Sequence, residues 1–244
     1  MIRPEVVHFE VTGETWRHRD LRKASEPEHY EDLFGMAFFL KALRRNLDHA
    51  YEPPKVAAPV ERNTDPAAIE MCRNQIKAMF FPQEFVWITN GLRHRGWCRT
   101  AEYWLEDIKN NGVPTGAQGA WIKENPMSKF GTGNGEVRDF RHALCEADCL
   151  SLQEQCDLAG MLPYPIVSAV HSGGKSIHYL LRVDATQETY TDLVKRLHEQ
   201  FPVFDAACKD PARWTRLAGA KRAGVLQAAL PTPASGHRSP GREP

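Results

Sequence analysis

The chain has 244 residues, long enough to bury a sizeable core as one large α/β domain or as one domain with an appendage. Its 31 basic and 31 acidic residues give a formal net charge of +0, which excludes a general attraction of the whole molecule to nucleic acid and leaves only local contacts. Its six cysteines lack paired CxxC spacing, which excludes a disulfide framework and indicates free thiols.

The sequence lacks the patterns of membrane insertion and export. No apolar run approaches the roughly 20 residues needed to span a bilayer. The opening sequence MIRPEVVHFEV has no apolar signal-peptide core. We therefore expect a protein of the cytoplasm with no membrane partner.

Residues 1–80 predict a small helical accessory region. Apolar residues recur at intervals of three and four over residues 33–47, which predicts an amphipathic helix. A proline-containing linker over residues 51–63 follows. Asp65-Pro66 then predicts the start of a second amphipathic helix, which ends near Phe80.

An alternation of strands and helices begins after residue 80 and predicts a mixed α+β domain over residues 81–222. Residues 85–89 and 119–122 have the composition of strands, while Thr100 opens a helix that Gly112 stops. Residues 223–244 are rich in Pro, Gly, Ala and Ser, and predict a flexible C-terminal tail.

Two carboxylates stand two residues apart in the sequence LCEAD. If Leu144 begins a strand that continues to Asp148, then Glu146 and Asp148 point to the same face. Hard carboxylate oxygens suit Mg²⁺ or Mn²⁺. This strand therefore predicts a platform for divalent metal ions.

A second motif, HSGGKSIHYLLRVD, predicts a turn and the second strand of a hairpin that residues 166–170 begin. The turn glycines let backbone N–H groups approach phosphate oxygens, and Ser176 and His178 then share one strand face. The GxxxxGK[ST] pattern of a P-loop is not met, because Ala169 stands where that pattern needs glycine and a strand follows instead of a helix. Carboxylates for a metal and donors for phosphates together suggest nucleotidyl transfer.

Two capping patterns predict helix starts around these motifs. Ser151 with Glu154 forms a capping box directly after Asp148. Asp184 with Gln187 has similar spacing and is expected to cap an amphipathic helix that Pro202 closes.

A zinc site is not expected from the nearby His142, Cys145, Cys149 and Cys156, although histidine and cysteine are residue types that bind zinc. Cys145 belongs to the metal-platform strand and Cys156 to the helix after it. Their convergence on one ion would distort both elements.

Four motifs in this order, ExD, SGGKSxH, FD and DPxRxxRLxG, resemble the Prim-Pol catalytic domain of the archaeo-eukaryotic primase superfamily. The resemblance covers roughly residues 119–222 and is strongest to primase-polymerases of phages, plasmids and CRISPR systems. It implies an RRM-like mixed sheet flanked by helices. The chain departs from the family's Leu-Pro-Gly by having Leu217-Ala218-Gly219, which predicts a less rigid turn.

The resemblance also implies an activity and its partners. The activity is template-dependent nucleotidyl transfer, in primer synthesis or primer extension, with two Mg²⁺ or Mn²⁺ ions. The substrates are NTP or dNTP on single-stranded or primed DNA, and helicases or CRISPR adaptation proteins are candidate partners.

Roles for individual residues follow from the same resemblance and from local charge. The expected nucleotide-binding residues are Ser172, Gly173, Gly174, Lys175, Ser176, His178, Arg213 and Arg216. Arginine suits this role because its guanidinium binds phosphate bidentately. Residues 209–222 carry five basic residues against one acidic residue, and Lys209, Lys221 and Arg222 are the expected nucleic-acid contacts.

The third metal-binding acid has three candidates. Asp184 lies six residues beyond His178, about 20 Å along a strand, and is better explained as a helix cap. Asp210 precedes Pro211, as is typical of a turn. Asp205 follows Phe204 and matches the third motif of the resembling family, so we predict that it joins Glu146 and Asp148.

Two other functions compete with this prediction. A degenerate member of the family would be a non-catalytic nucleotide-binding or nucleic-acid-binding module of a replication or CRISPR-associated assembly. A plasmid initiator that nicks DNA would need paired metal-binding histidines and a catalytic tyrosine, and the chain contains no His-x-His. The presence of Glu146, Asp148, His178 and a candidate third acid favours a catalytic primase-polymerase over both alternatives.

Overall fold

The computed structural model describes residues 9–11, 14–16, 61–91 and 96–232. The chain divides into two compact units, Met1–Glu52 and Pro53–Pro244. In the first unit, β1 (Phe9–Val11) pairs antiparallel with β2 (Glu14–Trp16). The amphipathic helix predicted over residues 33–47 lies outside the described residues.

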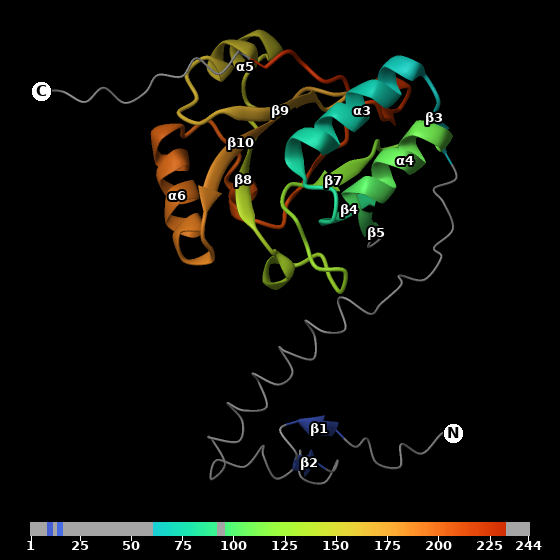
Figure 1. Ribbon diagram of the computed structural model, residues 1–244. Coiled ribbons are helices and arrows are strands. Elements are labelled where there is room, and N and C mark those ends of the chain that lie inside the picture. Colours follow the sequence, from blue (N-terminus) through green and yellow to red (C-terminus); the bar gives the residue numbers. More distant parts are fainter. Residues whose placement is uncertain (1–8, 12–13, 17–60, 92–95, 233–244) are drawn as a thin grey trace, which may run out of the picture. The chain divides into compact units, whose positions relative to one another are not determined.

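The second unit combines helices with antiparallel sheets, as the sequence predicted (Figure 1). Its helices are α3 (Pro66–Met79), α4 (Ala101–Asn111), α5 (Leu152–Ala159) and α6 (Gln187–Gln200), with short 3-10 helices η2 (Asn134–Glu136) and η3 (Ala206–Lys209). Within the described ranges, no helix is both long and apolar enough to cross a membrane.

Two sheets form the centre of this unit. One has the strand order β8 (Phe140–Cys145), β10 (Ile177–Ala185), β9 (Ile166–His171). The other has the order β11 (Trp214–Arg216), β7 (Trp121–Lys123), β4 (Phe85–Thr89), β5 (Trp97–Thr100). Two short pairs complete the unit, β3 (Arg62–Asn63) with β6 (Val113–Pro114) and β12 (Lys221–Arg222) with β13 (Val225–Leu226).

The three-stranded sheet is buried on both faces. Leu144 and Leu180 pack into the cluster that contains the apolar stripe of α3 and the inner side of α4. Their neighbours Cys145, Tyr179 and Leu181 belong to a second cluster with α5 and α6. Successive strand residues point to opposite faces, so these near-continuous apolar runs are those of a sheet covered by helices on both sides.

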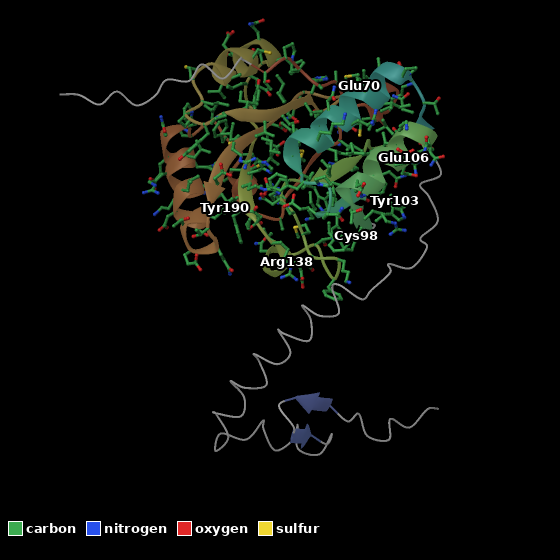
Figure 2. All side chains as sticks on the ribbon, in the orientation of Figure 1. Glu70, Cys98, Tyr103, Glu106, Arg138 and Tyr190 are labelled. Carbon is green, nitrogen blue, oxygen red and sulfur yellow. The ribbon has the colours of Figure 1, made fainter. Side chains whose placement is uncertain are left out.

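Helix α6 covers the outer side of this sheet. Its Tyr190, labelled in Figure 2, is buried. The Tyr190 ring packs against the ring of Phe140 at the start of β8, with centroids 5.7 Å apart.

Helix α3 starts as predicted but belongs to the second unit and not to an accessory region. The Asp65 side chain accepts a hydrogen bond from Ala67 N at 2.8 Å, and Pro66 occupies the first turn. Cys72 and Ile76 are fully buried in the main core. The expected boundary at residue 80 is therefore corrected, because the apolar face of α3 is buried by strands that follow it in sequence.

Helix α6 is not capped by Asp184. Thr186 caps it together with Thr189, and the Thr186 side chain accepts from Thr189 N at 3.3 Å. Asp184 instead has a φ of 44° and pairs with Arg182, with 2.6 Å between Arg182 Nε and Asp184 Oδ1. The prediction placed the cap two residues early, because β10 continues through Ala185.

The first part of the expected flexible tail is also corrected. Residues 225–230 pair with β12 and with the edge at β9, and Gln227 is fully buried. The Gln227 side chain accepts from Ala120 N at 2.8 Å and donates to Ala120 O at 3.2 Å. His171 N donates to Ala228 O at 2.9 Å and Leu230 N to Ala169 O at 2.8 Å, which extends the sheet beyond β9. Residues 233–244 lie outside the described residues.

A substitution in the turn between β12 and β13 should stabilise the fold. Ala223 and Gly224 have φ values of 47° and 82°, a combination that favours Asn-Gly or Gly-Gly. We expect Ala223→Asn to raise the free energy of unfolding by about 0.5–1 kcal/mol, because asparagine tolerates the left-handed region better than alanine. Urea unfolding measures the change. Ala67→Asn, at an exposed position without a positive φ, serves as the control and should bring no gain.

Candidate functional site

A cavity of about 720 Å³ opens beside the end of β8, the turn between β9 and β10, and the chain from Asp210 to Arg222. The predicted site residues that line it are Glu146, Asp148, Ser172, Gly174, Lys175, Ser176, His178, Arg213, Arg216 and Arg222. Gly173, Asp205, Lys209 and Lys221 are not part of the lining.

The two acids of the first motif follow strand β8 and do not lie on it as predicted. The strand ends at Cys145, which is paired with Tyr179 of β10. Glu146 comes next and faces His178, with 2.9 Å between His178 Nε2 and Glu146 Oε2. Asp148 lies in the turn beyond it, and its carboxylate pairs with Lys175 at 3.3 Å. The side chain of Glu146 is 15% exposed and that of Asp148 is 43% exposed.

Glu146 is the most constrained of these acids. Its Oε1 accepts a hydrogen bond from the thiol of Cys208 at 3.2 Å, and its carbonyl oxygen accepts from Asp205 N at 2.8 Å. Burial alone would raise the pKa of the Glu146 carboxyl. The hydrogen bond and charge of His178, followed by the Cys208 thiol and Arg213, outweigh burial and bring that pKa to about 2. Glu146 is therefore ionised at neutral pH.

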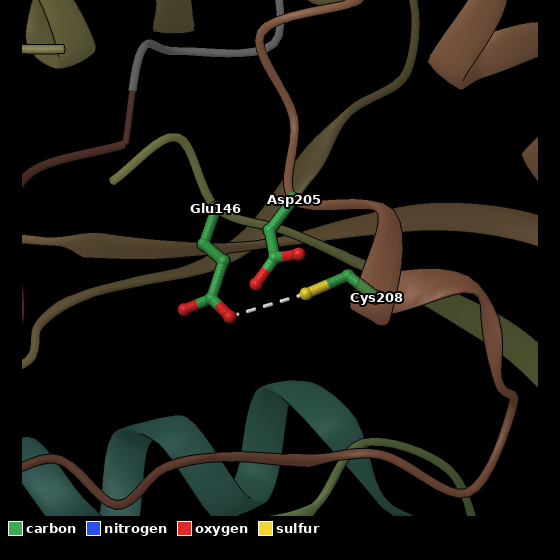
Figure 3. Close-up of side chains that lie close together, drawn as sticks. All are labelled: Glu146, Asp205 and Cys208. Atoms are coloured by element: carbon green, nitrogen blue, oxygen red, sulfur yellow. Dashed lines mark hydrogen bonds between the residues drawn. The ribbon is translucent and has the colours of Figure 1, made fainter. Parts of the chain in front are cut away.

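Asp205 is the one candidate third acid that lies beside Glu146. The ligand atoms of Glu146, Asp205 and Cys208 all lie within 4.8 Å of one another, and the three side chains point toward one another (Figure 3). Asp184 lies near the end of β10, and Asp210 accepts a hydrogen bond from Asn134 at 3.1 Å. Asp205 also caps η3 by accepting from Ala207 N at 2.9 Å.

The convergent donors thus differ from the predicted set. Two carboxylates and a thiol come together, while the Asp148 carboxylate faces Lys175. Cys208 was not among the residues predicted from the sequence. A local signal was present, because Cys208 stands three residues after Asp205 and a single helical turn brings such residues to the same side.

The four residues considered for zinc do not converge on one point. His142 and Cys145 are buried on β8, whereas Cys149 and Cys156 are exposed. His142 Nδ1 lies 2.8 Å from Glu124 O, so its ring is held by a backbone carbonyl.

The glycine turn is shaped by the segment that packs against it. Ser172 N donates to Ser176 O at 2.8 Å, and the two serine hydroxyls are 3.1 Å apart. Gly173 has a φ of 71°. A Cβ on Gly174 would lie 2.8 Å from Nη1 of Arg222. The glycines therefore allow Arg222 to approach the turn, and this arrangement brings its guanidinium to the cavity.

Three arginines, Arg213, Arg216 and Arg222, line the cavity. Arg213 precedes β11 and Arg216 ends it, so they lie along a strand segment and not on a helix face. The Arg216 guanidinium lies over the Trp121 ring, 4.5 Å from its centroid, and donates to Gln118 O at 3.1 Å. Burial, then the charge of Arg222, lowers the pKa of Arg216 to about 10, so the group stays charged at neutral pH.

Arg222 was expected in the nucleic-acid contact but lines the cavity. Lys209 and Lys221 are exposed. Lys221 and Arg222 are neighbours on β12, so their side chains point in opposite directions.

A buried acid outside the predicted set holds the backbone of Arg213. Glu124 is fully buried, its Oε1 accepts from Arg213 N at 3.2 Å, and its own N–H donates to Arg213 O at 3.2 Å. Within the described part of the chain, its Oε2 has no hydrogen-bond partner at normal hydrogen-bond geometry. Burial raises the pKa of Glu124 well above its usual range, more than the backbone N–H of Arg213 lowers it.

The raised pKa keeps the Glu124 carboxyl protonated and neutral above pH 4.5, and this predicts the effect of two substitutions. Glu124→Gln keeps a neutral acceptor of the same size and should leave nucleotide affinity and the free energy of unfolding close to wild type. Glu124→Ala leaves a cavity and an unpaired Arg213 N–H, and should cost about 2–4 kcal/mol of stability. Urea unfolding and nucleotide titration measure both effects.

The same raised pKa predicts the sign of the pH dependence. Above about pH 4.5 the unfolded chain loses a proton that folded Glu124 retains, so the free energy of unfolding falls as pH rises. Glu124→Gln should lack this decline. An identical pH dependence in both proteins would contradict a neutral Glu124.

No protein-family model and no curated protein matches the sequence. Solved structures that are similar to this chain include the AEP domain of the cyanophage S-2L primase-polymerase, with a TM-score of 0.49 and 20% identity over 67% of this chain and 90% of that chain. Primase RepB′ gives a TM-score of 0.43 and 17% identity over 67% of this chain and 55% of that chain. The catalytic domain of RepB′ in complex with initiator DNA gives a TM-score of 0.42 and 18% identity over 66% of this chain and 88% of that chain.

Proposed function

We propose that this chain is a primase-polymerase that joins nucleotides on a DNA template, in primer synthesis or primer extension. The observation that carries the proposal is that one cavity is lined by both carboxylates and arginines. Glu146 and Asp148 line it together with Arg213, Arg216 and Arg222. A triphosphate whose phosphates are bound by cations and whose reacting end faces metal-binding acids fits this arrangement.

The acids have the chemistry that Mg²⁺ or Mn²⁺ requires. Glu146 and Asp205 would hold the ion with their converging carboxylates, and Asp148 opens onto the same cavity. When bound, the ions lower the pKa of the primer 3′-hydroxyl and neutralise charge on the triphosphate. His178, 2.9 Å from Glu146 Oε2, fixes the orientation of that carboxylate.

The turn and the arginines would bind the phosphates. The hydroxyls of Ser172 and Ser176 and the backbone at Gly174 line the cavity, and Lys175 at its mouth is 73% exposed. Nucleotide binding would draw Lys175 from Asp148 toward phosphate and free that carboxylate for metal. The guanidinium groups supply charge and bidentate geometry.

DNA binding is assigned to charge outside the cavity. Lys209 and Lys221 are exposed and would contact template or primer phosphates. Because the chain has a net charge of +0, its affinity for DNA should rest on such local contacts and fall steeply with salt.

The decisive experiment is extension of a primed DNA template with Mg²⁺ or Mn²⁺, with NTP and dNTP supplied separately, and a parallel assay on unprimed template. Template-directed products support the proposal. Nucleotide binding without incorporation, under every metal and substrate combination, would instead favour a non-catalytic binding module.

Substitutions at two adjacent residues of β12 should distinguish nucleotide binding from DNA binding. Arg222→Gln should weaken nucleotide binding about 10- to 100-fold, the value of one charge-assisted contact, and leave DNA affinity nearly unchanged. Lys221→Gln should lower DNA affinity and reduce the slope of its salt dependence by about one. Nucleotide titration and DNA binding over a salt series measure the two effects. The reverse pattern would exchange the two assignments.

A further inference from the structure

A thiol lies among the acids proposed to bind metal. Cys208 is fully buried in η3, and its Sγ is 3.2 Å from Glu146 Oε1. Figure 3 shows this thiol and the Asp205 carboxylate directed toward the same carboxylate of Glu146. Mg²⁺ takes oxygen ligands and does not use a thiol. Zn²⁺ and Cd²⁺ bind thiolate sulfur together with carboxylate oxygen.

The spacing of these donors suits a tetrahedral ion. With Zn–S near 2.3 Å and Zn–O near 2.1 Å, tetrahedral geometry places sulfur and oxygen about 3.6 Å apart. The observed Sγ to Oε1 distance is 3.2 Å, and all three ligand atoms lie within 4.8 Å of one another. A shift of about 0.4 Å would bring the Cys208–Glu146 pair to the tetrahedral spacing. The Asp205 carboxylate, within 4.8 Å of both, would supply the third ligand and leave the fourth position for water.

The other cysteines lack this setting. Among the described residues, which include all six cysteines, the group of His, Cys, Asp and Glu side chains close enough to hold a metal ion consists of Glu146, Asp205 and Cys208. This donor set shares no residue with the His142 and Cys145 group considered for zinc.

We propose that Glu146, Asp205 and Cys208 form a site for a thiophilic divalent cation of the Zn²⁺ class, which competes with Mg²⁺ or Mn²⁺ for the two carboxylates. The cation replaces the thiol proton between Cys208 and Glu146, and that proton passes to solvent as the metal–sulfur bond forms. His178 keeps its contact with the other oxygen of Glu146. The regulatory consequence, inhibition of nucleotide incorporation, rests on the proposed function, whereas the binding site does not.

Cd²⁺ titration tests the site without measuring activity. The protein used is the full chain with Cys149→Ser and Cys156→Ser, which removes the two exposed thiols. We expect one equivalent of Cd²⁺ to produce the ultraviolet thiolate-to-metal absorption band. Adding Cys208→Ser should abolish the band, and adding Asp205→Asn should weaken Cd²⁺ binding at least about tenfold. Cd²⁺ should also release bound Mn²⁺, measured by electron paramagnetic resonance.

The proposal is overturned if the band persists after Cys208→Ser, or if Cd²⁺ binds without releasing Mn²⁺. Should Cys208→Ser fail to fold, cadmium NMR on the protein with Cys208 intact decides, because its chemical shift separates all-oxygen from sulfur-containing coordination. A chain without polymerase activity that still binds Cd²⁺ through Cys208 would contradict the proposed function alone. An active polymerase without this binding would contradict only the site.

Discussion

Replacing Glu146 with glutamine should lower nucleotide incorporation by about 1000-fold or more, equivalent to ~4 kcal/mol of transition-state stabilisation. Glutamine keeps the size of the side chain but removes the charge that would hold a divalent ion. The pKa of about 2 means that wild-type Glu146 supplies this charge throughout the neutral range. Single-turnover extension of a primed template at saturating nucleotide measures the chemical step.

The fold should survive this substitution. The Glu146 backbone contact with Asp205 N does not involve the side chain, and glutamine keeps an oxygen that can accept from the Cys208 thiol. Glu199→Gln is the matched control, because its carboxylate lies on the surface of α6 and is 63% exposed. Undiminished incorporation by both Glu146→Gln and Asp148→Asn would end the catalytic interpretation.

Local signals in the sequence predicted most helix starts correctly. Asp65 and Ser151 cap their helices because a short side chain and the N–H groups it accepts from lie within three residues. The same local reasoning chose the wrong capping residue at Asp184, because it could not tell where strand β10 ends. Thr186 offers an equivalent cap two residues later, and only the pairing of β10 with β8 decides where the strand ends.

The site was predictable in its motifs but not in its contacts. Glu146 and Cys208 are 62 residues apart, and the return of the chain after α6 brings them together. Arg222 was assigned to DNA because charge patterning does not show which way a strand residue points. Its approach to Gly174 depends on the β12–β13 pair packing on the glycine turn. Tertiary packing also decided that α3 belongs with the sheets, where sequence periodicity showed only that one face is apolar.

Substituting Gly219 with alanine should be the most destabilising of these changes. Gly219 has a φ of 79°, and an added Cβ would lie 2.2 Å from Ala68 O in the backbone of α3. Backbone strain and this clash together should lower the free energy of unfolding by about 3–5 kcal/mol. Gly224→Ala is the matched control, because its φ is 82° and an added Cβ would meet nothing within 4 Å. Strain alone should cost that variant about 1–2 kcal/mol.

The clash at Gly219 should also reach the nucleotide site. Gln75 of α3 donates to Arg216 O at 2.9 Å and accepts from Ala218 N at 2.8 Å, so the helix holds the chain that carries Arg216. Moving α3 away from Gly219 strains both hydrogen bonds and displaces the guanidinium from the cavity. Gly219→Ala should therefore weaken nucleotide binding as well as stability, whereas Gly224→Ala should affect stability alone. Urea unfolding and nucleotide titration of both variants test this, and equal small losses would mean that α3 does not support the phosphate-binding arginines.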